Sequence, residues 1–171
     1  PRLCSSAASD VYKRQEHARS IKSAEEIKAM RCSISACETS IHVMEKETKP
    51  GMTENDIWSI LHAENIKRGG EWIETRLLSS GTKTNPWFQE CGSKILQKNE
   101  IVAFDTDLVG CYSICTDISR TWWIGDQEPT NEMKQDYHIA LDHIQQNSEL
   151  VAPGVHSVSY THLRAHETYV H

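Results

Sequence analysis

The chain has 171 residues, of which 25% are charged and 38% hydrophobic, and its formal net charge is −6. This length suits one domain. No apolar run approaches the roughly 18 residues of a membrane-spanning helix, which excludes an integral membrane protein. The acidic balance argues against nucleic acid as a partner, because nucleic-acid-binding domains carry a basic surface. The six cysteines form no C-x-x-C pair, and no signal-peptide pattern is present, so we expect reduced thiols and a cytoplasmic protein.

The two ends of the chain differ from its middle. Residues 1–15 show no helical or strand period, and residues 158–171 contain no apolar stretch that would anchor them. Both strings look like translated sequencing-adapter read-through, as occurs at the ends of reading frames from assembled environmental DNA. We therefore expect 1–15 and 158–171 to be non-native tails. Residues 16–157 would then form one truncated catalytic domain.

Two helices are expected after the first tail. Ser23 and Glu26 have the spacing of a capping box, and apolar residues then recur every three or four positions. This pattern predicts an amphipathic helix of about 24 residues. Thr53 with Asp56 predicts the start of a second helix, and the glycine pair at 69–70 predicts its end.

Short strands follow, and then one more helix. Residues 74–81 are typical of a strand that ends in a turn, and residues 101–104 of a buried strand. The chain can turn at Gly110 and continues as a β-branched and aromatic stretch to Ile124. Thr130 then opens a last helix. Helices, then strands, then a helix predict an α+β domain.

Three aspartates carry the chemistry of this pattern. Asp105 and Asp107 project from the same face of a strand, because side chains alternate along it, and a hairpin would return Asp117 beside them. Like charges that face each other destabilise a sheet. A divalent cation is the simplest compensation, since carboxylate oxygens are ligands for such ions. The alternative is that one or more of these aspartates caps a turn in solvent.

Six short strings occur along the chain in the order typical of a known superfamily. They are Ser23-Ala24-Glu25-Glu26-Ile27, Lys49-Pro50-Gly51-Met52-Thr53-Glu54, Ser80-Gly81, Asn99 to Asp105, Thr116-Asp117-Ile118-Ser119-Arg120-Thr121 and Val151-Ala152-Pro153-Gly154-Val155. Their order and spacing resemble the creatinase, aminopeptidase P and methionine aminopeptidase superfamily, which has the pita-bread fold. The resemblance covers nearly all of residues 20–155 and implies only the first half of that fold.

The chain also departs from the peptidases of that superfamily. It has Asp105-Thr106-Asp107 where they usually show D-x-G, and it has no histidine between His62 and His138, although they carry one after the Ser-Gly strand. One branch matches better, the metallopeptidase-like dimethylsulfoniopropionate lyases of bacteria. The strings that resemble this branch are Thr84 to Gly92, Phe104 to Leu108, Gly110 to Tyr112 and Asp117 to Gly125.

This resemblance implies a metal-dependent lyase that cleaves a small zwitterionic substrate, dimethylsulfoniopropionate, to dimethyl sulfide and acrylate. It implies that Asp105, Asp107 and Asp117 are metal ligands, that two divalent ions of Fe, Zn or Mn are bound, and that the full-length protein is a homodimer. The remaining ligands, one His and two Glu, and the catalytic base are expected in sequence beyond this chain.

Four residues are candidates for binding that substrate. A sulfonium is a positive centre without hydrogen-bond donors, so aromatic faces suit it, and Trp87, Trp122 and Trp123 are the candidates. Core packing is the alternative for each tryptophan. Arg120 could hold the substrate carboxylate, or it could pair with an aspartate of the cluster.

Two other functions stay open. The first is an Xaa-Pro aminopeptidase or dipeptidase, which the histidine-free stretch around Trp87 disfavours. The second is a peptidase-like domain that binds partners without catalysis. We expect the 171-residue chain by itself to be inactive and poorly folded, because an incomplete ligand shell binds metal weakly and half a domain buries too little core.

Overall fold

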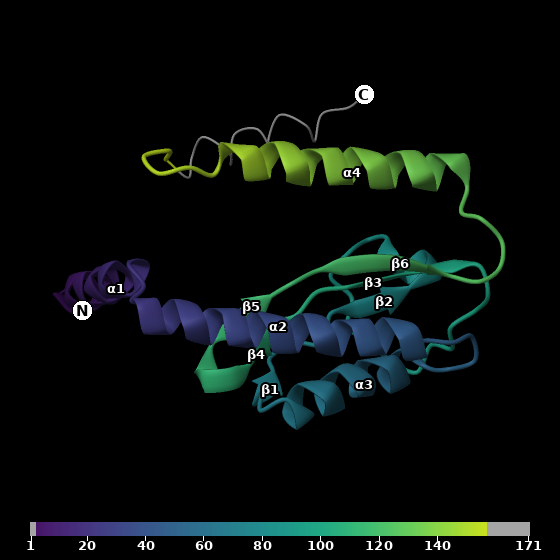
Figure 1. Cartoon of the computed structure of the whole chain (residues 1–171), viewed down its shortest axis with the longest axis horizontal. Helices are drawn as coiled ribbons and strands as arrows, with labels where there is room; N and C mark the ends of the chain where they lie inside the picture. Colours follow the sequence, from purple (N-terminus) through teal and green to yellow (C-terminus); the bar gives the residue numbers. More distant parts are fainter. Residues whose placement is uncertain (1–2, 157–171) are drawn as a thin grey trace. The chain divides into compact units, whose positions relative to one another are not determined.

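The computed structural model describes residues 3–156, with side chains from residue 11 onward (Figure 1). The predicted tail 158–171 lies outside this described part. The chain divides into two compact units, Pro1–Asp126 and Gln127–His171, and each is described here by itself.

Helix α2 (Ala24–Glu47) confirms the first expected helix. The Glu26 amide donates to Ser23 Oγ (3.2 Å), and the Ser23 amide donates to the Glu26 carboxylate (2.7 Å). This capping box satisfies backbone amides that the start of a helix otherwise leaves unpaired. One face of the helix is buried, through Ser33, Ala36, Cys37, Ser40, Ile41 and Met44.

Helix α3 (Glu54–Lys67) confirms the second. Thr53 and Asp56 form another capping box, with hydrogen bonds of 3.1 and 2.8 Å. The helix stops before Gly69, whose φ of +83° is a left-handed conformation that favours glycine. Helices α2 and α3 pack side by side in the first unit (Figure 1).

Helix α1 (Leu3–Ser20) covers most of residues 1–15, where the sequence shows no helical or strand period. Residues 11–20 are all exposed. A helical segment that buries no side chain, such as residues 11–20, needs no apolar period, and this explains why the sequence pattern over 11–15 gave no sign of it. The assignment of 1–15 as a non-native tail stays a prediction.

Within residues 3–156, the strands form two antiparallel sheets of three strands each. One sheet has the order β2 (Leu78–Ser80), β3 (Glu100–Phe104), β6 (Arg120–Ile124), and the other β1 (Trp72–Ile73), β4 (Asp107–Val109), β5 (Cys115–Asp117). Short 3₁₀ helices follow β2, at Gly81–Thr84, and β4, at Cys111–Ser113.

The strand expected over residues 74–81 is wrong in its first half. Residues 74–77 carry the chain from β1 in one sheet to β2 in the other, and the Leu78 amide donates to the Arg76 carbonyl (2.8 Å) across a tight turn. The strand expected over 101–104 is confirmed as β3. The extended stretch that leads to Ile124 is confirmed as β6, which begins at Arg120.

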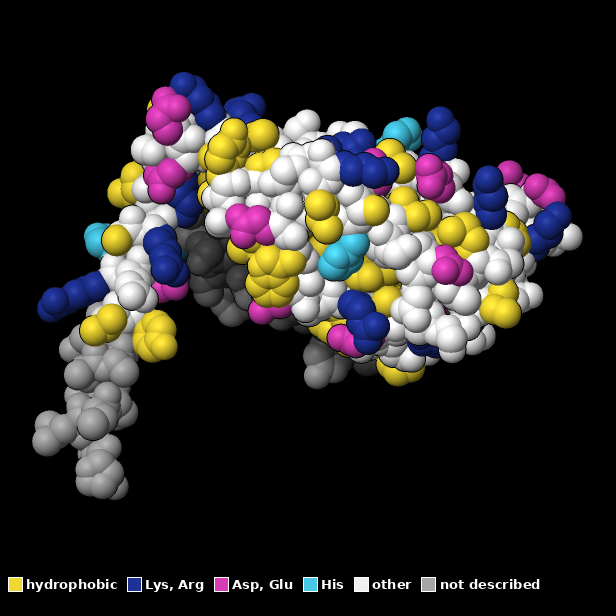
Figure 2. Space-filling view, turned by 90° about the horizontal axis from the view of Figure 1, so that it is seen from below, with side chains coloured by type: hydrophobic (Ala, Val, Ile, Leu, Met, Phe, Trp, Pro, Cys, Tyr) yellow, Lys and Arg dark blue, Asp and Glu magenta, His cyan; other side chains and the backbone are white. Residues whose placement is uncertain are grey.

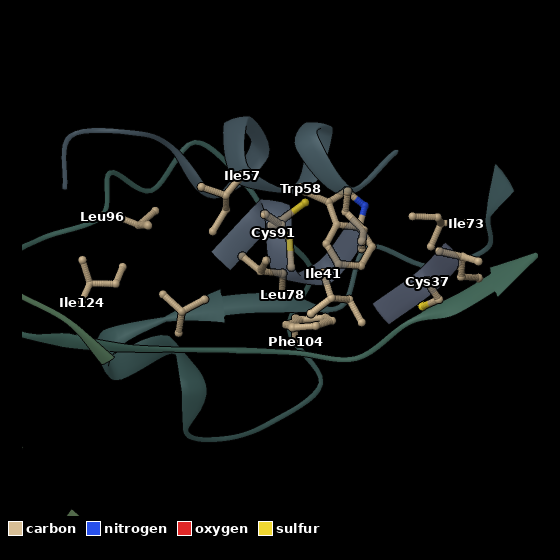
Figure 3. Close-up of a cluster of buried hydrophobic side chains, with 14 residues drawn as sticks. Cys37, Ile41, Ile57, Trp58, Ile73, Leu78, Cys91, Leu96, Phe104 and Ile124 are labelled. Atoms are coloured by element: carbon tan, nitrogen blue, oxygen red, sulfur yellow. The ribbon is translucent and has the colours of Figure 1, made fainter. Parts of the chain in front are cut away.

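The core lies between the helix pair and the β2-β3-β6 sheet. Trp58 of α3 and Phe104 of β3 meet edge to face, with ring centroids 6.5 Å apart, and Ile41, Leu78 and their neighbours pack around them (Figure 3). Fully burying one such side chain stabilises the fold by about 1.5–3 kcal/mol. Strand β3 is therefore held rigidly from one side, and this fixes the position of the residues that follow it.

The second unit contains helix α4 (Asn131–Leu150), which confirms the helix expected after Thr130. The Met133 amide donates to Thr130 Oγ1 (3.2 Å), and no side chain of α4 is buried.

Seen from the side of α3, the surface carries acidic and basic side chains interspersed (Figure 2). None of the helices within the described residues has the length and apolar character needed to cross a bilayer.

Candidate metal centre

The chain bends between β3 and β4, and again between β5 and β6. Thr106 is fully buried at the first bend. Its hydroxyl accepts a hydrogen bond from the Ile118 amide (3.2 Å) and lies 3.4 Å from the Thr116 carbonyl oxygen, so it joins the two bends. Because Thr106 points into the protein, Asp105 and Asp107 on either side of it point outward.

The register of β4 and β5 brings Asp117 directly opposite Asp107. The next pair, Leu108 and Thr116, is buried, so the aspartate pair faces away from the core. The expected hairpin is therefore confirmed, and Asp117 returns beside the first two aspartates.

Asp117 interacts with both other carboxylates, and Asp105 and Asp107 each accept a hydrogen bond from a hydroxyl group. Ser119 donates to Asp105 (2.6 Å), and Thr75 donates to Asp107 (3.1 Å). Desolvation by the surrounding protein raises the pKa of Asp117 above its ordinary value, and the hydrogen bond and negative charge of Asp105 and the charge of Asp107 raise it further. The cluster is thus a site of like-charge repulsion.

Among the described residues, no ion pair compensates this repulsion. Within residues 11–156, no lysine or arginine forms an ion pair with Asp105, Asp107 or Asp117. In the same part of the chain, no three His, Cys, Asp or Glu side chains are arranged to hold a metal ion by themselves. Three hard oxygen donors that need a positive charge fit a divalent metal, and further ligands are required to complete its shell. Metal binding by these residues stays a prediction.

Arg120 and Trp122 lie on the other face of the sheet. Arg120 is in register with Phe104 and forms an ion pair with Glu38 of α2 (3.6 Å). The Trp122 ring meets Phe104 edge to face, with centroids 5.6 Å apart, and packs against the core. Strand alternation places Asp105, the residue after Phe104, on the opposite side. The substrate role of Arg120 and Trp122 stays a prediction. The contacts of Trp122 match the alternative of core packing. Arg120 pairs with Glu38 rather than with an aspartate of the cluster.

Trp123 has the opposite orientation to Trp122, on the face that Ile101 also occupies. Trp122 and Trp123 together border a hollow of about 410 Å³ beside the end of α2, which His42 and Glu45 also line. The aspartates do not line this hollow.

Trp87 lies on the loop that leaves β2 and comes back beside it. The loop returns at Glu90, which bridges to Leu77, and the Leu77 carbonyl accepts the Asp105 amide (2.9 Å). The loop therefore returns beside Leu77, whose carbonyl is hydrogen-bonded to Asp105, the first aspartate of the cluster. Trp87 is half-buried, and its ring contacts the exposed ring of Phe88.

Glu54 fixes this loop, a role that the sequence analysis missed. Its carboxylate is fully buried and accepts hydrogen bonds from the amides of Ser80 (2.9 Å) and Gly92 (3.1 Å) and from Lys83 Nζ (2.6 Å). One side chain thus ties both ends of the loop. Glu54 appeared in the sequence only as part of the Pro-Gly turn motif, and only its burial reveals the network.

The chain matches metallopeptidase family M24 over residues 28–169, which is most of its length and reaches beyond the boundary expected at 157. The chain belongs to this metallopeptidase family. Membership implies the use of a divalent metal, in agreement with the uncompensated carboxylates.

Solved structures confirm the fold. A prolidase from Pyrococcus horikoshii superposes with a TM-score of 0.78 at 20% identity, over 85% of this chain and 41% of that one. A putative aminopeptidase P from Bacillus anthracis gives 0.79 at 22%, over 88% of this chain and 36% of that one. At such identities the likeness concerns the fold alone, and it confirms the first half of the pita-bread architecture.

Curated relatives fall into two groups. The chain is 57% identical over 145 residues to "Dimethylsulfoniopropionate lyase DddP" of Roseobacter denitrificans, which covers 82% of this chain and 32% of that protein. It is 29% identical to an uncharacterized peptidase of Staphylococcus epidermidis, over 85% of this chain and 41% of that one. The chain thus spans about a third of the length of the lyases it matches.

Proposed function

We propose that this chain is part of a metal-dependent lyase that cleaves dimethylsulfoniopropionate to dimethyl sulfide and acrylate. The observation that carries the proposal is its 57% identity to the Roseobacter denitrificans lyase, against 28–29% to the Staphylococcus peptidases of the same family. The histidine-free stretch that contains Trp87 supports the same choice, since a peptidase needs a proton-transfer partner near the scissile amide.

The reaction makes three demands on a site. A base must take the proton next to the substrate carboxylate, a positive charge must stabilise the carboxylate as negative charge develops on it, and the sulfonium end must be held. A divalent metal, when bound, supplies that positive charge. Asp105, Asp107 and Asp117 would hold the metal, because they are oxygen donors whose mutual repulsion a cation relieves.

The other parts of the site follow from the same proposal. Trp87 would hold the sulfonium with its ring face, on the loop that Glu54 fixes. Trp122, Trp123 and Arg120 remain candidates for the same substrate. The remaining metal ligands and the base would come from sequence outside this chain, since the lyases are about three times as long.

Finer properties are proposed on the resemblance. We propose two metal ions of Fe, Zn or Mn, a homodimeric full-length protein and a cytoplasmic location. The substrate would be a small zwitterion, and neither nucleic acid nor a membrane would be a partner, in keeping with the net charge of −6.

The test is a chimera in which the aligned residues of this chain replace the matching segment of the Roseobacter denitrificans lyase. We expect the metal-loaded chimera to release dimethyl sulfide, and Asp117→Asn to lower that rate by more than the roughly 10–100-fold that follows loss of a residue supporting a metal ligand. Asp126→Asn is the matched control, because Asp126 is exposed and pairs with Lys98 outside the cluster. Dimethyl sulfide release that is equal in the Asp117→Asn and control variants would contradict the proposal.

An Xaa-Pro peptidase is the second candidate, favoured by the fold of the prolidases and by the Staphylococcus relatives. The same chimera discriminates, because a Gly-Pro dipeptide can be offered in place of the sulfonium substrate. Cleavage of the dipeptide without release of dimethyl sulfide would replace the lyase by the peptidase.

A further inference from the structure

Two cysteines from distant parts of the chain lie where helix α2 packs against the turn between β4 and β5. Cys111 lies in the 3₁₀ helix Cys111–Ser113, is buried, and donates its S–H to the Arg68 carbonyl oxygen (3.1 Å). Cys32 lies on α2 and is exposed. Both are free thiols.

The backbone around these two residues is fixed on both sides. Ser33, next to Cys32, donates to the Ile114 carbonyl oxygen (2.9 Å), and the Gly110 amide donates to the same oxygen (2.9 Å). A Cβ on Gly110 would lie only 2.0 Å from Ser33 Oγ, so α2 sits directly against the turn. The contact between α2 and the turn is therefore tight and leaves the thiols little freedom to separate.

Cys32 is also among the groups that bear on the ionisation of Cys111. Burial raises the pKa of Cys111, and the charge and side-chain hydrogen bonding of Cys32 raise it further. The Ser33 contact with Gly110 and Ile114 brings the neighbouring residues Cys32 and Cys111 to the same junction of α2 and the turn. Cys32 is open to solvent there, whereas Cys111 is buried.

We propose that Cys32 and Cys111 form a redox-active thiol pair that a peroxide oxidises to an intramolecular disulfide. The arrangement matches that of a peroxide-sensing pair, an accessible thiol beside a second, resolving one. The proposal does not depend on the lyase assignment, because neither thiol belongs to the proposed metal or substrate site.

The reaction balances in two steps. The Cys32 thiolate attacks one oxygen of hydrogen peroxide, the O–O bond breaks, and Cys32 becomes a sulfenic acid as hydroxide leaves and takes up a proton to form water. The Cys111 sulfur then attacks the Cys32 sulfur, the S–S bond forms, the S–O bond breaks, and the Cys111 proton leaves with the hydroxide as a second water. Two thiols are oxidised by two electrons, and one peroxide is reduced to two waters.

The disulfide would act on the strands that carry the aspartates. The turn that holds Cys111 connects β4, which begins at Asp107, to β5, which ends at Asp117. A covalent link from this turn to α2 would restrict opening of the hairpin. Oxidation would therefore protect the hairpin's backbone amides against hydrogen exchange.

The experiment treats the full 171-residue chain with hydrogen peroxide under native conditions, and the lyase chimera in parallel. In the isolated chain we expect the reactive thiols to fall from the six of the sequence to four, and a thiol reductant to restore them. Tryptic peptides 32–46 and 99–120 should become linked in both proteins, and fragment ions should place the bond between Cys32 and Cys111 rather than Cys37 or Cys115.

Matched variants decide the assignment. Cys32→Ser and Cys111→Ser should each abolish the linked peptide, whereas Cys115→Ser, which changes an exposed cysteine of the same hairpin, should leave its yield unchanged. The use of the chimera covers the case in which the isolated chain folds poorly. The proposal is overturned if neither protein yields a Cys32–Cys111 link, or if native oxidation gives the same mixture of pairs as oxidation in urea.

Discussion

Replacing Asp117 with Asn changes the charge of the aspartate cluster while nearly preserving its shape. In the metal-free protein the change should stabilise the fold, because the neutral amide removes the repulsion of an ionised Asp117 by two like charges, Asp105 and its cross-strand partner Asp107. Like charges directly opposite in a sheet cost roughly 0.2–1 kcal/mol. Because Asp117 is exposed, solvent screens both interactions, and we expect a gain of about 0.5–1 kcal/mol in all.

The pH dependence of this gain has a definite sign. A carboxyl group whose pKa is raised by folding is protonated more easily in the folded state, so ionisation costs stability as the pH rises from the ordinary value of 3.8 through the raised folded value. The Asn variant avoids this loss. Its advantage should be absent in strong acid, grow through that range and be complete above the raised folded-state pKa.

The assay is thermal unfolding of the lyase chimera, with and without metal. Without metal and at low salt, Asp117→Asn should raise Tm by about 1–2 °C, and added salt should reduce the gain by screening. With metal, the variant should unfold below the unsubstituted chimera, since it has lost a ligand. Asp126→Asn should show neither effect. A metal-free Tm lowered by the substitution, or an unchanged stabilisation by metal, would refute the reasoning.

Three further outcomes are expected. The isolated 171-residue chain should unfold over a broad range without tightly bound metal, which calorimetry and metal analysis check, and a sharp transition with retained metal would contradict this. Thr53→Ala should cost about 1 kcal/mol in urea unfolding by removing a helix cap. The hydrogen bonds of the cap also lower the pKa of Asp56, so the stability that they contribute should be lost as pH falls below 3.8. Circular dichroism against pH should therefore show a smaller loss of stability in acid for the Thr53→Ala variant than for the unsubstituted protein. Glu54→Ala should lower the free energy of unfolding by about 3–5 kcal/mol, because Lys83 and buried amides lose their acceptor. The loop should then be released, so chymotrypsin should cut at Trp87 and Phe88. A loop that stays uncut would contradict the role of Glu54.

The helices and the aspartate hairpin could be predicted from the sequence because their signals are local. The capping boxes at Ser23 and Thr53 lie within four residues, and β3 is a continuous apolar run. The facing of Asp107 and Asp117 follows from alternation once a hairpin is assumed. The strand predicted over residues 74–77 is wrong, because a segment that crosses between two sheets can carry the same residue types as a strand.

Contacts between distant segments could not be predicted in the same way. The pairing of Arg120 with Glu38 joins β6 to α2, and nothing near Arg120 in the sequence identifies that partner. Glu54 resembles an ordinary residue in the first turn of a helix until its burial under Ser80 and Gly92 is seen. The bend at Thr106 decides which way Asp105 and Asp107 point, and it depends on a hydroxyl that reaches Ile118 on the returning strand.

The measurement that tests the central claim most directly is the dimethyl sulfide released by the metal-loaded chimera from dimethylsulfoniopropionate, compared with its hydrolysis of a Gly-Pro dipeptide. The account predicts sulfide release within about tenfold of the Roseobacter denitrificans lyase, acrylate in equal amount, and no dipeptide cleavage, because the aligned segments are 57% identical. Rapid dipeptide hydrolysis without dimethyl sulfide would contradict it.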